Sequence, residues 1–172
     1  MSLTFVAGTP TDVFGGEFAE SVEAVLRNSF GFTAAPNEEP YRSEPVDGSG
    51  WRELQKLATS MLGPDRAANL TKVEAYQAVY IPSSTTGVNQ VPIANAADPL
   101  QVGSLPGLIS ELTEFAGRAS LPVDDLELMG MAAQYLEDDD AFEKELDIQT
   151  YIQLMLTARQ ALARKQALWV VA

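Results

Sequence analysis

The chain of 172 residues contains no histidine and no cysteine. Without histidine it lacks the side chain that titrates near neutral pH, and without cysteine it lacks a thiol nucleophile. A Ser–His–Asp triad, a Cys–His pair and an ordinary zinc site are therefore excluded within this sequence. No disulfide can form, which fits a reducing compartment such as the cytoplasm.

Basic residues are also scarce, with 11 Lys and Arg against 24 Asp and Glu and a net charge of −13. Proteins bind nucleic acid largely through Lys and Arg on phosphates, and anionic membranes attract basic segments. The composition therefore predicts neither a nucleic-acid partner nor a membrane partner. A basic protein is an electrostatically suitable partner, and solubility alone is the simpler explanation of the charge.

Long apolar runs are the third absence. No segment reaches the roughly 18 consecutive apolar residues that a membrane-spanning helix needs. The first basic residue is Arg27, so the N-terminal region lacks the positive start of a secretory signal. We therefore expect a cytoplasmic protein.

What is present suffices for a packed core, because 46% of the residues are hydrophobic and only 20% are charged. Apolar residues recur at helical spacing in several segments, which predicts about five helices. One of them carries Leu126, Met129, Ala133 and Leu136 at this spacing. The predicted helices are 16–30 ending at Gly31, 50–62 capped by Ser49, one starting at Ser104, one starting at Ser120, and a last one from Asp147 to about Lys165.

Three segments are predicted to be strands of one small sheet, namely 3–7, 71–81 and 167–171, although residues 74–78 of the second could equally be helical. The last is apolar on both sides, as in a strand covered on both faces, so we expect it to be central. The fold class is therefore α+β, with residues 1–172 forming a single compact domain. Residues 32–48 and 82–103 are expected to be long surface loops, the second with a hairpin around 87–90 as the alternative.

Ten carboxylates gather between Asp124 and Asp147, and Lys144 is the one base among them. An EF-hand starting at Asp138 fails, because its sixth position is Glu143 instead of Gly and its twelfth is Gln149 instead of Glu. Three interpretations remain: a solvated turn whose acids cap helices and favour their dipoles, a surface for a protein partner, or a site for a hard cation.

Other chemistry has weaker support. The glycine-rich turn 8–16 lacks the sequence of a phosphate-binding loop, and its Glu17 and Glu20 would repel an anion. Gly48-Ser49-Gly50 is no nucleophile elbow, and none of the four lysines stands in a catalytic motif. The tryptophans and tyrosines are more typical of a core than of a ligand pocket.

These patterns favour a non-catalytic, cytosolic protein-binding domain of the inhibitor, immunity or adaptor type over an enzyme. No catalytic residue, metal ligand or cofactor is predicted. The alternative is an enzyme or small-molecule binder that uses carboxylates and tyrosines, with residues 82–103 as a lid. The predicted partner-binding residues are Glu137, Asp138, Asp139, Asp140 and Glu143.

Overall fold

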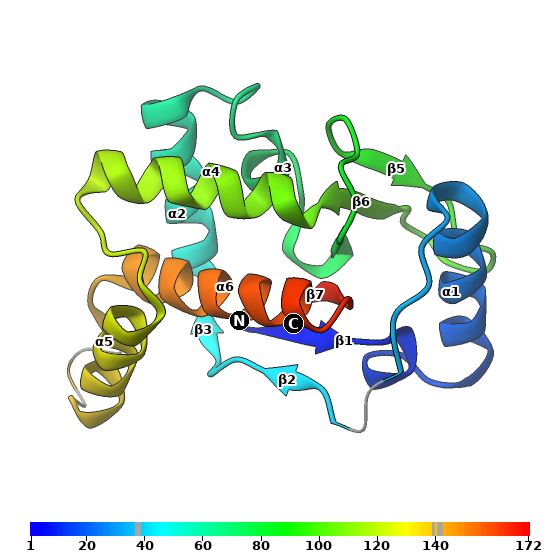
Figure 1. Cartoon of the computed structure of the whole chain (residues 1–172), viewed down its shortest axis with the longest axis horizontal. Helices are drawn as coiled ribbons and strands as arrows, with labels where there is room; N and C mark the ends of the chain where they lie inside the picture. Colours follow the sequence, from blue (N-terminus) through cyan, green and yellow to red (C-terminus); the bar gives the residue numbers. More distant parts are fainter. Residues whose placement is uncertain (37–38, 139, 141–142) are drawn as a thin grey trace.

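The computed structural model describes residues 1–36, 39–138, 140 and 143–172 (Figure 1). The strands are β1 (Ser2–Gly8), β2 (Tyr41–Arg42), β3 (Val46–Asp47), β4 (Ala78–Ile81), β5 (Asn89–Val91), β6 (Leu100–Ser104) and β7 (Ala167–Val171). The α-helices are α1 (Gly16–Phe30), α2 (Gly48–Leu62), α3 (Ala68–Thr71), α4 (Leu105–Ala119), α5 (Asp125–Glu137) and α6 (Leu146–Ala163). Two short 3-10 turns, η1 (Pro10–Asp12) and η2 (Ala75–Gln77), complete the described elements.

The seven strands form one mixed sheet in the order β2-β1-β7-β4-β6-β5, with β3 paired to β1. The C-terminal strand β7 runs antiparallel to both of its neighbours, β1 and β4. Strands β4 and β6 are parallel to each other. The predicted α+β domain with a central C-terminal strand is therefore confirmed.

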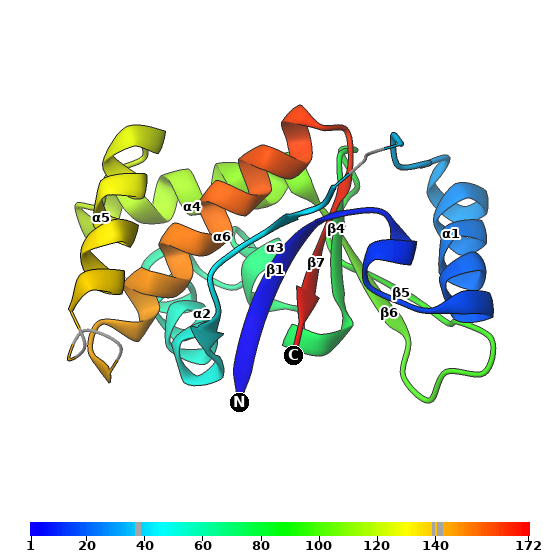
Figure 2. The same ribbon diagram turned by 90° about the horizontal axis from the view of Figure 1, so that it is seen from below.

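The sheet separates two hydrophobic cores (Figure 2). Along β7, Leu168 and Val170 face the core beneath α2, α4 and α6, while Trp169 faces the core that α1 covers. Strand β4 alternates in the same way, with Tyr80 on one face and Val79 on the other. This alternation follows from the two-residue period of a strand and explains why the central strands are apolar throughout.

Helix α6 is the central helix of the larger core. It packs against β1, α2, α4 and α5, so its buried residues point in several directions. Tyr151, Leu154 and Met155 are all fully enclosed. Gly50 lets α2 approach it closely, because a Cβ at this position would collide with the carbonyl oxygen of Leu146.

Several predicted helix boundaries are confirmed, since α1 spans the predicted 16–30 and α2 ends at residue 62, and others are wrong. Helix α1 ends at Gly31, whose φ of 64° is the left-handed conformation that glycine adopts easily. Ser104 caps α4 by accepting a hydrogen bond from Gly107 N at 3.1 Å. Ser49 does not cap α2, because the Asp47 carboxylate accepts from Ser49 N at 2.7 Å.

The cap predicted at Ser120 is also wrong, because Ser120 closes α4 in the left-handed conformation, with φ of 56°. Asp124 caps α5 instead, accepting from Leu126 N at 3.0 Å. Asp147 lies in the first turn of α6, whose N-cap position is occupied by Glu145. In each case the cap position is taken by a nearby residue, either through its carboxylate or through a left-handed backbone conformation, and not by the residue that the sequence favours.

The strand and loop predictions need three corrections. Residues 32–48 are not a single surface loop, since they contain β2, β3 and the first residue of α2, and Val46 is buried. The strand expected over 71–81 is limited to β4, because α3 and η2 occupy most of the segment before it. Residues 82–103 are not a single surface loop, since they contain β5 and most of the buried strand β6. Strand β6 is hard to recognise because Gly103 lowers its strand propensity. Gly103 is required there, since a Cβ would lie 2.8 Å from Asn69 Oδ1.

Candidate functional site

Helix α5 is the least enclosed long helix on the α6 side of the sheet. It lies at one end of the molecule, alongside α6 and away from the sheet (Figures 1 and 2). Leu128 is its one fully buried residue. By contrast Leu126 is 79% exposed, Met129 57% and Leu136 65%, values that are high for large apolar side chains arranged in a row.

The exposed side chains form a continuous stripe. At about 100° per residue, Leu126, Met129, Ala133 and Leu136 fall within roughly 80° of the helix circumference. We call these four residues the α5 stripe. The opposite side of the helix packs against the core through Leu128, Met131, Ala132 and Tyr135. Helix α5 is therefore apolar on two sides and buried on one, whereas a helix that is apolar all round is normally buried all round.

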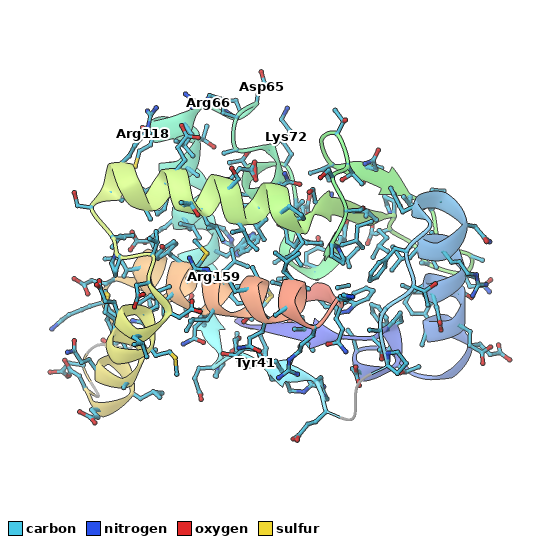
Figure 3. All side chains as sticks on the ribbon, viewed as in Figure 1. Tyr41, Asp65, Arg66, Lys72, Arg118 and Arg159 are labelled. Atoms are coloured by element: carbon cyan, nitrogen blue, oxygen red, sulfur yellow. The ribbon has the colours of Figure 1, made fainter. Side chains whose placement is uncertain are left out.

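Three polar contacts hold α5 in this orientation. Arg159 of α6 forms an ion pair with Asp125 at the start of α5 (Figure 3). The Tyr151 hydroxyl donates to the carbonyl oxygen of Pro122 at 2.7 Å. At the other end, the Tyr135 hydroxyl donates to the Glu145 carboxylate. These contacts fix both ends of α5 on α6, so the α5 stripe faces outward.

Tyr135 and Tyr151 are both held in their neutral, protonated form. Burial raises the pKa of Tyr151 to about 12. Burial also raises the pKa of Tyr135, and the hydrogen bond to the Glu145 carboxylate and its charge raise it further. Both hydroxyls therefore remain hydrogen-bond donors at neutral pH, which suits a structural role better than a catalytic one.

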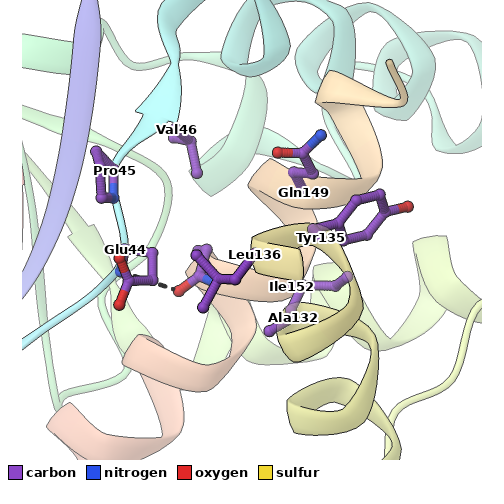
Figure 4. A pocket seen from close by; sticks show the side chains of 9 residues that line it. Glu44, Pro45, Val46, Ala132, Tyr135, Leu136, Gln149 and Ile152 are labelled. Carbon is purple, nitrogen blue, oxygen red and sulfur yellow. Dashed lines mark hydrogen bonds between the residues drawn. The ribbon is translucent and has the colours of Figure 1, made fainter. Parts of the chain in front are cut away.

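A small pocket opens beside the α5 stripe (Figure 4). It has a volume of about 80 Å³, several times the roughly 10–15 Å³ that one water needs. Glu44 N donates to Gln153 Oε1 at 3.2 Å and closes one side. Leu136 belongs to both the α5 stripe and the pocket. The lining residues are Glu44, Pro45, Val46, Ala132, Tyr135, Leu136, Gln149, Ile152 and Gln153. We call this hollow the α5 pocket.

Four of the five acids predicted from the sequence lie at the C-terminal end of α5. Glu137 ends the helix, and Asp138, Asp140 and Glu143 follow it, all exposed. Asp140 N donates to Asp138 Oδ1 at 3.0 Å, which folds this turn on itself. Asp139 lies outside the described residues. The structure thus brings the predicted acids together next to an apolar surface that the acidic pattern did not predict.

The dipole of α5 explains only some of the acidic residues around this helix. Asp124, Asp125 and Glu127 lie at its N-terminus, where the dipole favours carboxylates. Glu137 and Asp138 lie at its C-terminus, where the dipole disfavours them. The turn also leads directly into α6, which begins at Leu146 and has Asp147 in its first turn, so only the acids that end α5 stand at a disfavoured helix end. Among the described residues, no group of three or more acidic side chains is arranged to hold a metal ion.

The other sequence candidates have structural explanations. In the turn between β1 and α1, the Asp12 carboxylate accepts from Thr9 N at 2.7 Å, so this backbone donor is already used. Ser49 donates its hydroxyl to Asp47. Trp51 and Trp169 are core residues, and Tyr80 is fully enclosed and donates to the carbonyl oxygen of Asn69.

Glu111 is the one acid among the described residues that is buried, and it is 7% exposed. Its Oε1 accepts from Asn69 N at 2.9 Å, so it supplies the cap that the short helix α3 lacks. Burial raises the pKa of Glu111 to about 7, although the N–H groups of Asn69 and Leu70 oppose the shift. A pair of buried acids, which carboxylate catalysis of the glycosidase kind would need, is not found in the described chain.

No known protein family matches this sequence, and no curated protein or solved structure is significantly similar to it. In the part of the chain that the structure describes, no helix has the length and apolar character needed to cross a membrane. The geometry around α5 is therefore the main guide to function.

Proposed function

We propose that this protein is a non-catalytic domain that binds a basic protein through the α5 stripe and the acids at the ends of α5. One observation carries the proposal: Leu126, Met129 and Leu136 are each more than half exposed on one side of a single helix. Fully burying such a side chain is worth about 1.5–3 kcal/mol. A partner that covers the α5 stripe would recover part of this free energy.

Charge supports a basic partner. The chain has a net charge of −13, and seven of the described acids stand at or just beyond the two ends of α5. They are Asp124, Asp125, Glu127, Glu137, Asp138, Asp140 and Glu143. Opposite charges around an apolar centre speed association and exclude wrong partners.

A second copy of the chain fits this surface poorly. If α5 packed against its own symmetry mate, each acidic end would face an acidic end of the other copy, whether the helices ran parallel or antiparallel. Like charges in such a contact are destabilising. A basic partner with an apolar centre would cover the α5 stripe and pair with the acids at its ends.

The proposal is tested by a double variant, Leu126→Gln with Met129→Gln. Immobilised wild-type and variant proteins are used to capture partners from lysate, and each captured protein is identified, purified and titrated by calorimetry. The matched control is Tyr76→Gln, because Tyr76 is 58% exposed and lies outside α5. We expect the double variant to weaken binding of a basic partner at least about tenfold and the control to leave it unchanged. A partner that binds both variants equally would contradict the proposal, as would capture of acidic proteins alone.

The alternative function, a small-molecule binder or enzyme that uses carboxylates, is supported by one observation. Glu111 lines an open surface cleft of about 460 Å³ beside Asn69, Lys72, Thr86 and Gly107, and its buried Oε2 has no hydrogen-bond partner in the described chain. The cleft lies where the parallel strands β4 and β6 end, a common place for ligands. The lid expected at 82–103 is reduced here to the turn that holds Thr86 and Gly87.

A thermal-shift screen of small polar metabolites tests this alternative. A compound that binds the cleft should raise the Tm of the wild-type protein and not that of Glu111→Gln. If no compound separates the two proteins, the alternative loses its support. The outcome is independent of α5 and leaves the protein-binding proposal to its own test.

A further inference from the structure

We infer that the partner segment that α5 receives is a basic amphipathic helix whose apolar anchor side chain enters the α5 pocket. The inference rests on the proposed function and specifies its partner. Three features support it: the surface shape of the α5 stripe, the walls of the α5 pocket and the placement of the acids.

The surface shape of the α5 stripe is suited to packing against a helix. Met129 and Leu136 are seven residues apart, which is about 10 Å along the axis. Between them lie Gly130 and Ala133, both exposed. A Cβ built on Gly130 would meet no atom within 4 Å, so the space above it is open. Large side chains on either side of small ones leave a depression, and helices pack by placing side-chain ridges into such depressions.

The α5 pocket gives this surface one deeper point. Its walls come from three parts of the chain, with Ala132 and Leu136 on α5, Ile152 on α6, and Pro45 beside β3 (Figure 4). These walls are apolar, and the Gln153 carbonyl group on its polar side already accepts from Glu44 N. The pocket thus suits an aliphatic side chain. Binding energy in protein interfaces is concentrated at buried anchors of this kind.

The acids define the polar part of the partner. Three precede or begin α5, and the others end or follow it, so the α5 stripe has carboxylates at both ends. From Leu126 to Leu136 the helix rises about 15 Å, or nearly three turns. A matching partner helix has an apolar stripe of similar length with Lys or Arg at both ends. This pattern is the helix-in-groove mode of recognition, with anchors spaced at i, i+3 or i+4 and i+7.

The test uses a synthetic peptide of about 15 residues, long enough for partial helicity in water. It has Leu on one face, Ala and Gln elsewhere and Lys at both ends, with a fluorescent label for anisotropy titration. Circular dichroism follows its helicity in the complex. Three companion peptides change the central Leu to Ala, replace the Lys residues with Glu, or insert a helix-breaking Pro.

We expect the central Leu to tighten binding about 10-fold or more over Ala, the effect of burying most of one leucine side chain. The Glu and Pro peptides should bind even more weakly than the Ala peptide, and the helicity of the Leu peptide should rise when it binds. On the protein side, Ala132→Met fills the α5 pocket and should abolish the difference between the Leu and Ala peptides. Because these peptides leave the protein unaltered, their comparison does not depend on how the variant folds.

The outcomes separate the inference from the proposed function. If binding depends on Leu126 and Met129 but not on the central Leu of the peptide, the anchor is wrong and the docking surface stands. If the Pro peptide binds as well as the helical one, the partner segment is not a helix. If no peptide distinguishes wild-type protein from the Leu126→Gln, Met129→Gln variant, both proposals fail. A dimer in sedimentation that this variant abolishes would show that the occupant is a second copy and overturn both.

Discussion

Helices α5 and α6 lie side by side, and both carry apolar residues around most of their circumference. Helix α6 is enclosed by the sheet, α2, α4 and α5, and Tyr151, Leu154 and Met155 are fully buried. Helix α5 packs mainly against α6, and Leu126, Met129 and Leu136 remain exposed. The same pattern thus has two outcomes, and the difference is the basis of our proposal that another molecule covers α5.

Truncating buried and exposed leucines gives the largest contrast between the two helices. Leu154→Ala removes a fully buried side chain of α6 and should lower the free energy of unfolding by about 3–5 kcal/mol, through lost burial and a cavity. Leu126→Ala should change it by less than about 0.5 kcal/mol. Urea denaturation followed by circular dichroism measures both. Similar losses in the two variants would show that α5 is packed more tightly than its exposure indicates.

Buried and exposed acids should also differ in how pH changes their contribution to the free energy of unfolding. The raised pKa of Glu111 means that the folded state holds its proton more tightly than the unfolded state does. Its contribution to stability is therefore fully present below about pH 4.5 and is lost as the pH rises from there through about 7, by up to about 3 kcal/mol. Glu111→Gln removes the charge and keeps an oxygen for Asn69 N.

Urea denaturation at pH 5 and pH 8 tests this dependence. The Glu111→Gln variant should gain stability relative to wild type on going from pH 5 to pH 8. Asp138→Asn, an exposed site, is the matched control and should show no such gain. A parallel pH dependence in the wild-type and Glu111→Gln proteins would contradict the buried charge.

The contacts that orient α5 should have an intermediate effect. Tyr151→Phe removes the hydrogen bond to the carbonyl oxygen of Pro122 and leaves the ring in place. It should cost about 1 kcal/mol, since the carbonyl oxygen loses its partner near the surface of the core. Hydrogen exchange should speed up in α5 more than in α6. Uniform acceleration in both helices would indicate that they unfold as one unit.

Neutralising the acids beyond α5 should have the smallest effect on stability. Asp138→Asn with Asp140→Asn relieves repulsion at the negative end of the helix dipole and should raise stability by a few tenths of a kcal/mol. The same double variant should slow association with a basic partner and reduce the salt dependence of the rate. Stopped-flow mixing at two salt concentrations measures this. An unchanged rate would show that these acids do not face the partner.

Much of the fold follows from local sequence signals. The helical spacing of Val22 and Leu26, together with Gly31, defines α1. The unbroken apolar run 167–171 correctly indicates a strand covered on both faces. Strand β6 escapes prediction because its pairing with β4 and the close approach of Asn69 to Gly103, both non-local, override its weak local propensity.

The candidate site is only partly predictable. Acidic residues are visible as composition, so the sequence alone indicates Glu137, Asp138 and Asp140. The spacing of Leu126, Met129 and Leu136 correctly indicates a helix, but helical spacing cannot say which of two apolar sides meets the core. That choice depends on the tertiary contacts that Arg159 and Tyr151 of α6 make with α5 and the segment before it. The α5 pocket likewise joins residues more than 100 positions apart in the chain.

We propose above all that α5 buries its outer side on a basic protein. The most direct measurement is the affinity of the purified partner for wild-type protein, for Leu126→Gln with Met129→Gln, and for Tyr76→Gln. The account predicts that Kd rises at least about tenfold in the α5 variant and stays unchanged in the Tyr76 variant, with both variants fully folded. Equal affinity for all three proteins would contradict it.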